Sequence, residues 1–251
     1  MAIYAAQVDR MDQNIWRLLT CLEEQGIMNN TVIMFLNDNG ACAEGGELGA
    51  GPAEQLGTEE GYFLSYGRAW ANASNSPYRK YKHWVHEGGI STPFIVHWPD
   101  GFPKNNRGNL VNEYGFLPDI MATCINLAHA EYPQEYLGHE MPPMEGKSLL
   151  PLIQGKREPV HTEPIFWEHE GNKAVRLGPY KLVQEWKQDQ TDHWELYDMV
   201  DDRTELHDLS AEMPEKLSEM KALYVEWSQK NKVRPWAEIE ELYRQKRRSE
   251  Q

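Results

Sequence analysis

A short, continuously apolar run near the N-terminus constrains the fold of this chain more than any other feature. The run spans residues 31–36, Thr-Val-Ile-Met-Phe-Leu, and turn-forming residues flank it on both sides. Because successive positions are apolar, it predicts a strand buried on both faces, as in a parallel sheet covered by helices. A second run at residues 92–99 predicts another strand, in which Pro93 is tolerated near the start. Together the two runs predict an α/β fold.

Helical periodicity surrounds both predicted strands. Apolar residues three and four apart over residues 4–22 predict an amphipathic helix that Gly26 ends. Residues 117–127 predict a second helix, with Pro118 in its first turn. The intervening stretch at residues 41–81 is rich in glycine and predicts a long irregular loop. Loops of that length are usually functional.

The last third of the chain changes character after a proline-rich connection at residues 130–164. Four short apolar segments separated by turns predict a small antiparallel sheet. These segments are residues 165–167, 173–176, 180–183 and 194–197. A helix is predicted from Pro214 and a polar helical tail at residues 236–251. We therefore expect part of an α/β domain at residues 1–160 and a smaller antiparallel-sheet α+β subdomain at residues 161–251.

The composition excludes several classes of partner. The chain has 39 acidic and 25 basic residues, so its formal net charge is −14 at pH 7. Nucleic acids and anionic membranes attract basic surfaces, so neither is expected as the main partner. No apolar run reaches the roughly 18 residues of a membrane-spanning helix. Three cysteines without CxxC spacing predict no disulfide framework, and the apolar surroundings of Cys21 and Cys124 predict buried thiols.

The first predicted strand ends in a tetrapeptide that places oxygen donors at the edge of the sheet. Its residues are Asn37, Asp38, Asn39 and Gly40. In α/β sheets, ligands bind at the carboxyl ends of the strands. The carboxylate of Asp38 and the amide oxygen of Asn39 suit a hard cation such as Ca²⁺ or Mg²⁺. An ordinary Asp-Asn-Gly turn explains the same residues, and both interpretations stay open.

A second polar motif precedes the second predicted strand. The two glycines of Glu87-Gly88-Gly89 permit a close approach of the backbone, and Lys82 lies five residues before Glu87. A lysine beside a bound cation can hold an anionic ester through its ammonium group. The alternative for Lys82 is a solvated surface lysine.

The histidines give a weaker signal. His83 and His86 have HxxH spacing, but no second ligand pair follows at a zinc-like interval, so the spacing does not predict a zinc site. Residues 168–172, Glu-His-Glu-Gly-Asn, form a polar insertion between two predicted strands. This insertion is either a plain hairpin loop or part of a pocket wall that includes His169.

Taken together, these motifs resemble the C-terminal portion of the sulfatase (arylsulfatase) family in the alkaline-phosphatase-like superfamily. The matching stretches have the order and spacing of that family across nearly the whole chain. They are residues 4–6, 8–12, 30–40, 82–93, 146–149 and 194–198. The resemblance implies that Asp38 and Asn39 are ligands of an active-site calcium. It also implies that Lys82 contacts the sulfate, and it suggests a pocket-lining role for His169.

The chain departs from the family pattern at the nucleophile. Sulfatases use a formylglycine made from the first residue of a Cys/Ser-x-Pro/Ala-x-Arg motif, and none of Cys21, Cys42 and Cys124 begins one. We therefore expect the C-terminal part of a sulfuric ester hydrolase whose nucleophile lies upstream, so that this chain is inactive alone. The expected substrate is a sulfated small molecule or glycan.

Two other functions stay open at this point. One is a phosphatase or phosphonate monoester hydrolase of the same superfamily, although Asn39 in place of a histidine disfavours a two-zinc site. The other is a non-catalytic binding module. Members of the family are often periplasmic or secreted, but the sequence indicates neither a compartment nor an oligomeric state for this chain.

Overall fold

A computed structural model describes residues 1–61, 64–104, 107–189 and 192–249. The chain divides into two compact units, each built from separate segments. The first unit comprises Met1–Gln13, Leu36–Phe94 and Glu163–Gln251, and the second comprises Asn14–Phe35 and Ile95–Thr162. Every residue that the sequence nominates for a site belongs to the first unit. The division at residues 160 and 161 stays a prediction about domains.

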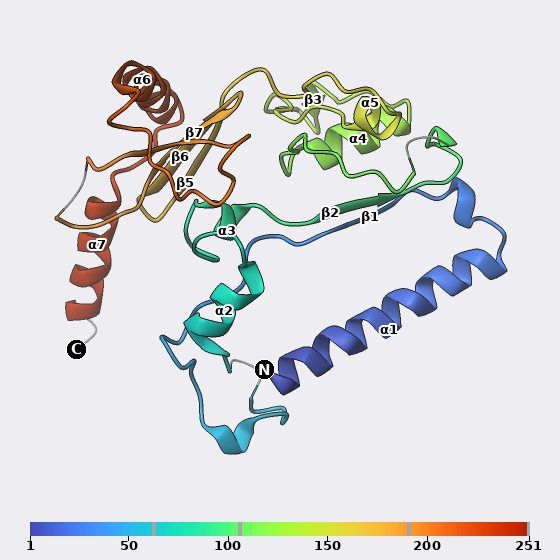
Figure 1. The fold of residues 1–251 in the computed structure, drawn as a ribbon, viewed down its shortest axis with the longest axis horizontal. Coiled ribbons are helices and arrows are strands. Elements are labelled where there is room, and N and C mark those ends of the chain that lie inside the picture. The colour runs from blue at the N-terminus through green and yellow to red at the C-terminus, as the bar shows by residue number, and fades with distance from the viewer. Residues whose placement is uncertain (62–63, 105–106, 190–191, 250–251) are drawn as a thin grey trace. The chain divides into compact units, whose positions relative to one another are not determined.

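The first unit contains a four-stranded antiparallel sheet in the order β5-β6-β7-β8 (Figure 1). Its strands are β5 (Ile165–His169), β6 (Asn172–Leu177), β7 (Tyr180–Gln184) and β8 (Glu195–Asp198). The predicted strands of the C-terminal third are therefore confirmed. Tight turns at Gly171 and Gly178, both with positive φ, connect the first three strands.

One face of this sheet forms a core with helix α6 (Pro214–Lys230). Val175, Leu182 and Leu196 lie opposite one another across β6, β7 and β8 and are fully buried. Met220 and Tyr224 of α6 pack against them. Because side chains alternate between faces in a strand, the period of two seen in the sequence puts these apolar residues on the same side.

The opposite face of the sheet packs on the segment that precedes the second predicted strand. Ala174, Val183 and Tyr197 are buried together with Val85 and Met199 in a second cluster. The sheet is thus covered on both faces, and the face away from α6 supports the segment around Val85. This contact is what positions the candidate site described below.

The remaining elements of the first unit are short, apart from the C-terminal helix. They are η2 (Ala53–Gln55), α2 (Gly67–Asn75), α3 (Glu87–Ile90) and α7 (Trp236–Ser249). Helix α2 lies inside the stretch that the sequence predicted to be irregular, so that prediction is wrong for residues 67–75. The tail predicted as helical at residues 236–251 is confirmed for α7.

The second unit is organised around α4 (Asp119–Leu127) and a buried aspartate at its first residue. Asp119 accepts hydrogen bonds from the backbone N–H of Phe116 at 2.7 Å and of Lys147 at 2.8 Å. The Nε2 atom of His161 lies 2.7 Å from its Oδ2 atom. A single carboxylate therefore ties three separate loops to the start of the helix. The unit also contains η1 (Met28–Asn30), α5 (Leu150–Ile153) and the hairpin of β3 (Glu135–Tyr136) and β4 (His139–Glu140).

The two strands predicted from the N-terminal half are confirmed as β1 (Ile33–Leu36) and β2 (Phe94–His97), which pair with each other. The burial predicted for the first of these strands is wrong, because Phe35 is 37% exposed; in β2, Phe94 is 38% and Ile95 59% exposed. In the part of the chain that the structure describes, this sheet has only two strands. Its apolar side chains therefore remain accessible to solvent.

Helix α1 (Ala2–Glu24) confirms the predicted amphipathic helix, and Gly26 ends it with a positive φ of 69°. None of its residues is buried. Consequently Cys21 is exposed, as is Cys124 on α4, and the prediction of buried thiols is wrong for both. The side chain of Gln25 donates to the sulfur of Cys21 at 3.2 Å, a contact on the exposed surface of α1. Among the described helices, none is both long enough and apolar enough to cross a bilayer.

Candidate functional site

The turn after β1 meets the Gly-Gly motif through direct backbone contact. The backbone N–H of Gly40 donates to the carbonyl oxygen of Gly89 at 2.9 Å. A Cβ atom added at Gly40 would lie 1.8 Å from the carbonyl oxygen of Gly88, so no larger residue fits there without displacing the backbone. The expected close approach is therefore present, and it puts Asp38 and Asn39 beside the segment that carries Lys82.

Asn75, at the C-terminal end of α2, fastens the same two segments from the side. Its Oδ1 atom accepts the backbone N–H of Ala41 at 3.0 Å. Its Nδ2 atom donates to the carbonyl oxygens of Gly88 at 2.7 Å and Lys80 at 3.1 Å. Sequence reasoning missed Asn75, because it lies in a stretch without helical periodicity and belongs to no recognisable motif.

Lys82 is attached to the turn through its backbone and to Glu44 through its side chain. Its N–H donates to the carbonyl oxygen of Ala41 at 3.0 Å, and its Nζ atom lies 3.1 Å from Glu44 Oε1. The hydrogen bond and the charge of Glu44 raise the pKa of Lys82, and the nearby carboxylate of Asp38 adds to the rise. The Lys82 side chain is 43% exposed, so this pair contributes little to stability.

The structure thus brings Asp38, Asn39 and Lys82 to one locality of the first unit. Asp38 is exposed and Asn39 is half-buried. Among the described residues, neither of these two side chains makes a hydrogen bond, so the oxygens of both are available to a ligand. Glu44, which sequence reasoning also missed, pairs with the ammonium group of Lys82 in place of an anion from solution.

A buried ion-pair cluster holds Glu87, the first residue of the Glu-Gly-Gly motif. The Nζ atom of Lys181, which is completely buried, lies 2.8 Å from Glu87 Oε1 and 2.8 Å from Glu205 Oε1. The other oxygen of Glu205 accepts the backbone N–H of Glu87 at 2.9 Å. Burial alone would raise the pKa of Glu87, but the charge of Lys181 lowers it below its ordinary value. This cluster fixes α3 to the sheet.

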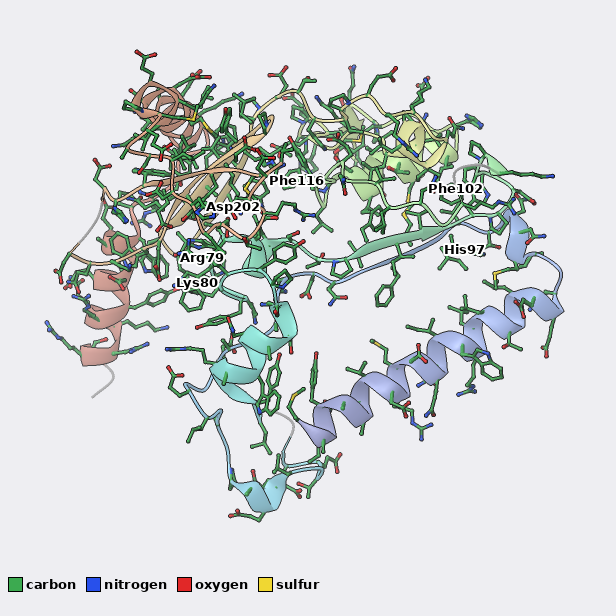
Figure 2. The ribbon with its side chains drawn as sticks, viewed as in Figure 1. Arg79, Lys80, His97, Phe102, Phe116 and Asp202 are labelled. Carbon is green, nitrogen blue, oxygen red and sulfur yellow. The ribbon has the colours of Figure 1, made fainter. Side chains whose placement is uncertain are left out.

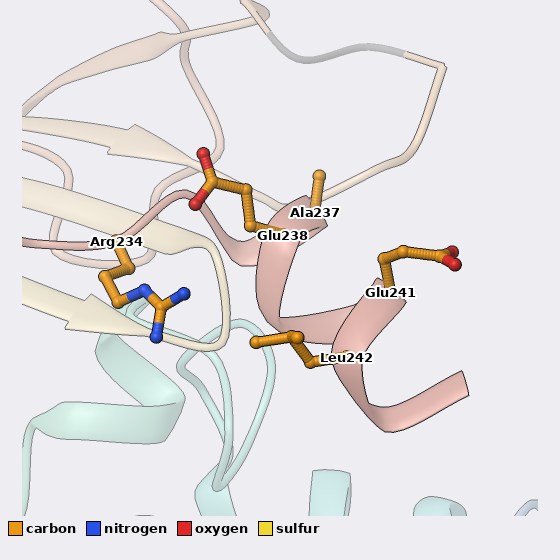
Figure 3. Close-up of a pocket in the computed structure, with 5 residues that line it drawn as sticks. All are labelled: Arg234, Ala237, Glu238, Glu241 and Leu242. Atoms are coloured by element: carbon orange, nitrogen blue, oxygen red, sulfur yellow. The ribbon is translucent and has the colours of Figure 1, made fainter. Parts of the chain in front are cut away.

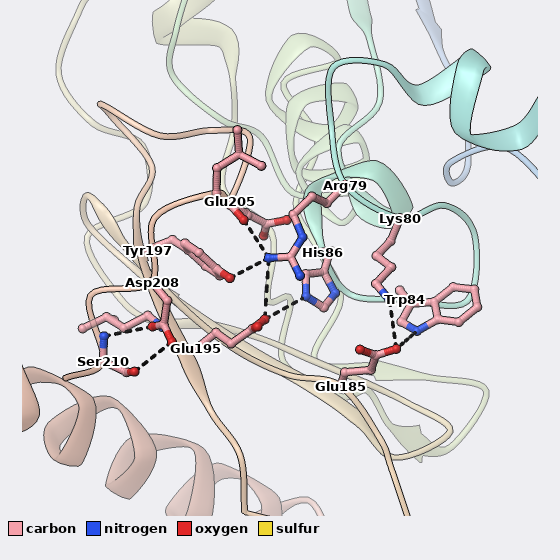
Figure 4. Close-up of polar contacts among 12 residues, drawn as sticks. Arg79, Lys80, Trp84, His86, Glu185, Glu195, Tyr197, Glu205, Asp208 and Ser210 are labelled. Atoms are coloured by element: carbon pink, nitrogen blue, oxygen red, sulfur yellow. Dashed lines mark hydrogen bonds and ion pairs between the residues drawn. The ribbon is translucent and has the colours of Figure 1, made fainter. Parts of the chain in front are cut away.

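Further polar contacts fix the residues just before the motif to the same face of the sheet (Figure 4). Arg79 donates at 2.6 Å both to the hydroxyl of Tyr197 and to the carbonyl oxygen of Glu205. Figure 2 shows Arg79 and Lys80 next to one another where the segment meets the C-terminal sheet. Lys80 Nζ and Trp84 Nε1 both donate to Glu185, at 2.9 Å and 3.0 Å. Lys82 therefore lies on a short loop that is anchored on both sides.

His86 completes this set of anchors. It is fully buried, and its Nε2 atom lies 3.3 Å from Glu195 Oε2. The hydrogen bond from His86, with the charge of Arg79, overcomes the effect of burial and lowers the pKa of Glu195 to about 2. The carboxylate thus stays ionised in the folded protein under ordinary conditions. His86 is thus an anchor of the loop through Glu195, and among the described residues His83 forms its cluster of possible ligands with His169 and Glu170 instead.

His169 is the last residue of β5, next to the turn that leads to β6, and its ring faces His83, the residue after Lys82. The two rings meet edge to face with 5.2 Å between their centroids. Glu170 Oε2 is 3.1 Å from His83 Nδ1. Burial lowers the pKa of His83, although Glu170 opposes this, so that imidazole is neutral at neutral pH. The structure therefore brings a fourth nominated residue, His169, next to the Lys82 loop.

Hollows elsewhere in the first unit contain none of these residues. One of about 500 Å³ lies along α7 and is lined by Arg234, Leu242 and their neighbours (Figure 3). Another of about 840 Å³ lies between the start of α1 and the loop at residues 48–66, where the rings of Tyr4 and Tyr66 stack 4.9 Å apart. Neither hollow is lined by Asp38, Asn39, Lys82 or His169.

Comparison with known proteins agrees with this geometry. A family model described as Sulfatase matches residues 1–130, and one described as N-sulphoglucosamine sulphohydrolase, C-terminal, matches residues 78–233. The crystal structure of Ps i-CgsB superposes with a TM-score of 0.67 at 25% identity, covering 90% of this chain and 42% of that one. The fold is thus α/β and alkaline-phosphatase-like, as predicted.

Sequence relatives narrow the class to one family. An uncharacterized sulfatase of Schizosaccharomyces pombe is 34% identical over 238 residues, which cover 88% of this chain and 42% of the relative. An arylsulfatase of Klebsiella aerogenes is 38% identical over 167 residues, which cover 62% of this chain and 35% of the relative. The chain belongs to the sulfatase family. It spans about two fifths of the length of these curated relatives.

Proposed function

We propose that the protein to which this chain belongs hydrolyses sulfate monoesters to an alcohol and sulfate. Family membership and the ordered motifs support this proposal. The observation that carries it is the attachment of the Asp38-Asn39 turn to the Lys82 loop, through the Gly40–Gly89 and Lys82–Ala41 hydrogen bonds. The two oxygen donors would hold a cation, and this cation and the nearby ammonium group would both contact the sulfate group.

Asp38 and Asn39 would hold a calcium ion. The fit rests on the donor set, a carboxylate and an amide oxygen at the end of a strand, with no hydrogen bonds of their own within the described residues. Calcium takes six to eight oxygen ligands, so other segments and the substrate would supply the rest. When bound, such an ion neutralises negative charge on the sulfate oxygens.

Lys82 would bind and orient the sulfate. Its ammonium group now pairs with Glu44, and an incoming sulfate would replace that carboxylate at Nζ. The anchored contacts on either side, at Lys80 and Trp84, keep the loop in place while this exchange happens. As the bond from sulfur to the leaving oxygen breaks, Lys82 would stabilise the charge that remains on the sulfate oxygens.

The nucleophile would come from residues outside this chain, as a formylglycine, so we expect the chain alone to show no turnover. The substrate class is a sulfated small molecule or glycan. Among solved structures with the same fold, one is Ps i-CgsB in complex with k-i-k-neocarrahexaose and another was determined with D-glucosamine-2-N,6-O-disulfate. His169, next to the Lys82 loop, would then contact the alcohol part of the substrate.

The proposal is tested by assaying the full-length protein on an aryl sulfate and an aryl phosphate in parallel. We expect the sulfate to be the better substrate and Lys82→Ala to lower kcat/KM at least about 100-fold, the cost of losing one charge-stabilising donor. Lys232→Ala, an exposed lysine on another surface, is the matched control. Dominant phosphatase activity would favour the related phosphatases and phosphonate hydrolases.

Calcium titration of the chain tests the alternative of a binding module without catalysis. We expect weak binding that Asp38→Ala abolishes, because only two protein ligands are present. Tight calcium binding by the chain, together with a full-length protein that turns over neither ester, would support the binding module and reject the hydrolase.

A further inference from the structure

Three potential metal ligands meet where the β5–β6 turn faces the Lys82 loop. They are His83, His169 and Glu170, and one ligand atom from each lies within 4.8 Å of the other two. His83 is half-buried, whereas His169 and Glu170 are exposed. The cluster is separate from the Asp38-Asn39 turn in its residues and differs from it in chemistry, since two of its three donors are imidazole nitrogens.

The spacing of the ligand atoms is close to that of a tetrahedral site. Ligands about 2.0–2.1 Å from a zinc ion stand about 3.3 Å from one another in a tetrahedron. The distance from His83 Nδ1 to Glu170 Oε2 is already 3.1 Å. Because the His169 and Glu170 side chains are exposed, rotation about their own bonds suffices to bring the third ligand in.

The turn that carries two of the ligands is firmly constrained. Glu168 accepts the backbone N–H of Gly171 at 2.9 Å, which closes the turn. Asn172, which is 1% exposed, donates from Nδ2 to the carbonyl oxygen of His169 at 3.0 Å. Its Oδ1 atom accepts the backbone N–H of Trp186 at 3.1 Å. These contacts, in which the buried Asn172 takes part, therefore fix the backbone of His169 and Glu170.

His83 is constrained from the other side. Its φ is +93°, in the left-handed region, a conformation that a residue with a side chain keeps only when its surroundings enforce it. Its ring meets Trp84 edge to face with 4.8 Å between the centroids. The anchored contacts of Lys80 and Trp84 hold the backbone on either side. This strained conformation directs the imidazole toward the turn.

We infer that His83, His169 and Glu170 form a binding site for a divalent transition metal, of which zinc is the best match. Two imidazoles and one carboxylate are a donor set that zinc accepts with a water molecule in the fourth position. Nitrogen donors also favour zinc, nickel or cobalt over calcium, which prefers oxygen ligands. The site would be distinct from the calcium ligands of the proposed function.

Binding requires one rearrangement of the His83 ring. Without metal, Nδ1 faces the Glu170 carboxylate and Nε2 faces the side-chain nitrogen of Asn172 at 3.4 Å, so Nδ1 carries the proton. When the metal coordinates Nδ1, the ring carries its proton on Nε2 instead, and the contact of 3.4 Å between Nε2 and the side-chain nitrogen of Asn172 is lost. The ring stays neutral, and the ion replaces a proton between His83 and Glu170.

The experiment is a calorimetric titration of the full chain with Zn²⁺ in the presence of excess Ca²⁺, which occupies oxygen-only sites. We expect one zinc ion per chain, and visible absorption bands of a four-coordinate ion when Co²⁺ replaces zinc. The double variant His169→Ala/Glu170→Gln should weaken zinc binding at least about 100-fold. Mutation of a residue that only supports a metal ligand already lowers the affinity for the metal about 10–100-fold. Asp38→Ala should leave the affinity for zinc unchanged.

The chain supplies a matched control in the exposed dipeptide His139-Glu140 of β4. The double variant His139→Ala/Glu140→Gln changes the same two residue types at a place without a third ligand, and we expect it to bind zinc as the parent chain does. Zinc binding that both double variants weaken equally would overturn the inference, as would the absence of zinc binding in the parent chain. Circular dichroism of each variant verifies that its fold is intact.

Discussion

The C-terminal sheet and the strand pair β1–β2 differ both in sequence and in surroundings. The strands of the sheet mix apolar with charged and polar residues, whereas the strand pair is apolar at every position except His97. In the C-terminal sheet, Leu182 and Leu196 are fully buried between the sheet and α6. In the strand pair, Phe94 and Ile95 are 38% and 59% exposed.

The difference teaches that an apolar strand is stabilised by what covers it and not by its own composition. Burial of a leucine-sized side chain contributes about 1.5–3 kcal/mol. The C-terminal sheet obtains this contribution on both faces, from residues that include Val85 and Met199, 114 positions apart in the sequence. The β1–β2 strands do not obtain it from the described residues, so we expect them to be the region that associates with further protein.

The largest effect should come from the buried ion-pair cluster. Lys181→Met leaves Glu205 buried without its partner at Nζ, and leaves Glu87 with only the half-exposed Arg203 at 3.5 Å, which should lower the free energy of unfolding by about 3–5 kcal/mol. Urea denaturation of the chain measures the change. Lys187→Met, which removes an exposed lysine that pairs with Glu185, should cost less than about 1 kcal/mol. Equal effects of the two variants would show that the cluster does not fix α3.

A pair of truncations compares the two regions directly. Leu182→Ala should lower the free energy of unfolding by about 2–5 kcal/mol, because it leaves a cavity in a covered core. Ile95→Ala should change it by no more than about 0.5 kcal/mol, because the side chain is already exposed. Urea denaturation again provides the measurement. If Ile95→Ala proves as costly as Leu182→Ala, the strand pair is covered in solution, for instance by a second copy of the chain.

The smallest effect concerns pH. The pKa of Glu195 is lowered from 4.5 to about 2 in the folded protein, so its ionised form contributes stability above the unfolded pKa. That contribution is lost as pH falls from about 4.5 through about 2. Glu195→Gln should therefore flatten the fall of stability over this range, whereas the exposed control Glu212→Gln should not. An identical acid dependence in Glu195→Gln would place the sensitivity at another carboxylate.

Several elements could be predicted from the sequence because their signals are local. The alternation of apolar residues in β5 to β8 and the three-to-four spacing in α1 and α4 each report one face of one element. The buried residues of helix α2, Gly67 and Ala71, are four apart but too small to form a recognisable apolar stripe, so the helix escaped prediction. The burial of Phe35 and Cys21 was predicted wrongly, because apolar composition does not say which surface will cover a side chain.

The residues of the candidate site also fall into those with a local sequence signal and those whose contacts come from distant parts of the chain. Asp38, Asn39 and Lys82 were nominated from motifs whose residues are neighbours in the sequence, and their roles as ligands stay predictions. Glu44 and Asn75 were missed because their contacts with Lys82 and Ala41 cross more than thirty residues. Likewise, HxxH spacing gave no reason to pair His83 with His169.

The sequence by itself determined the fold class, the family and the chemical types at the end of the first strand, since all of these follow from short-range patterns. Only the tertiary structure decided which groups meet. Lys181 lies 94 residues from Glu87, and the sheet brings the two together at 2.8 Å. The reason is that the sequence of a strand shows which of its residues share a face but not which distant residues pack on that face. Long-range pairs are therefore decided only when the elements pack.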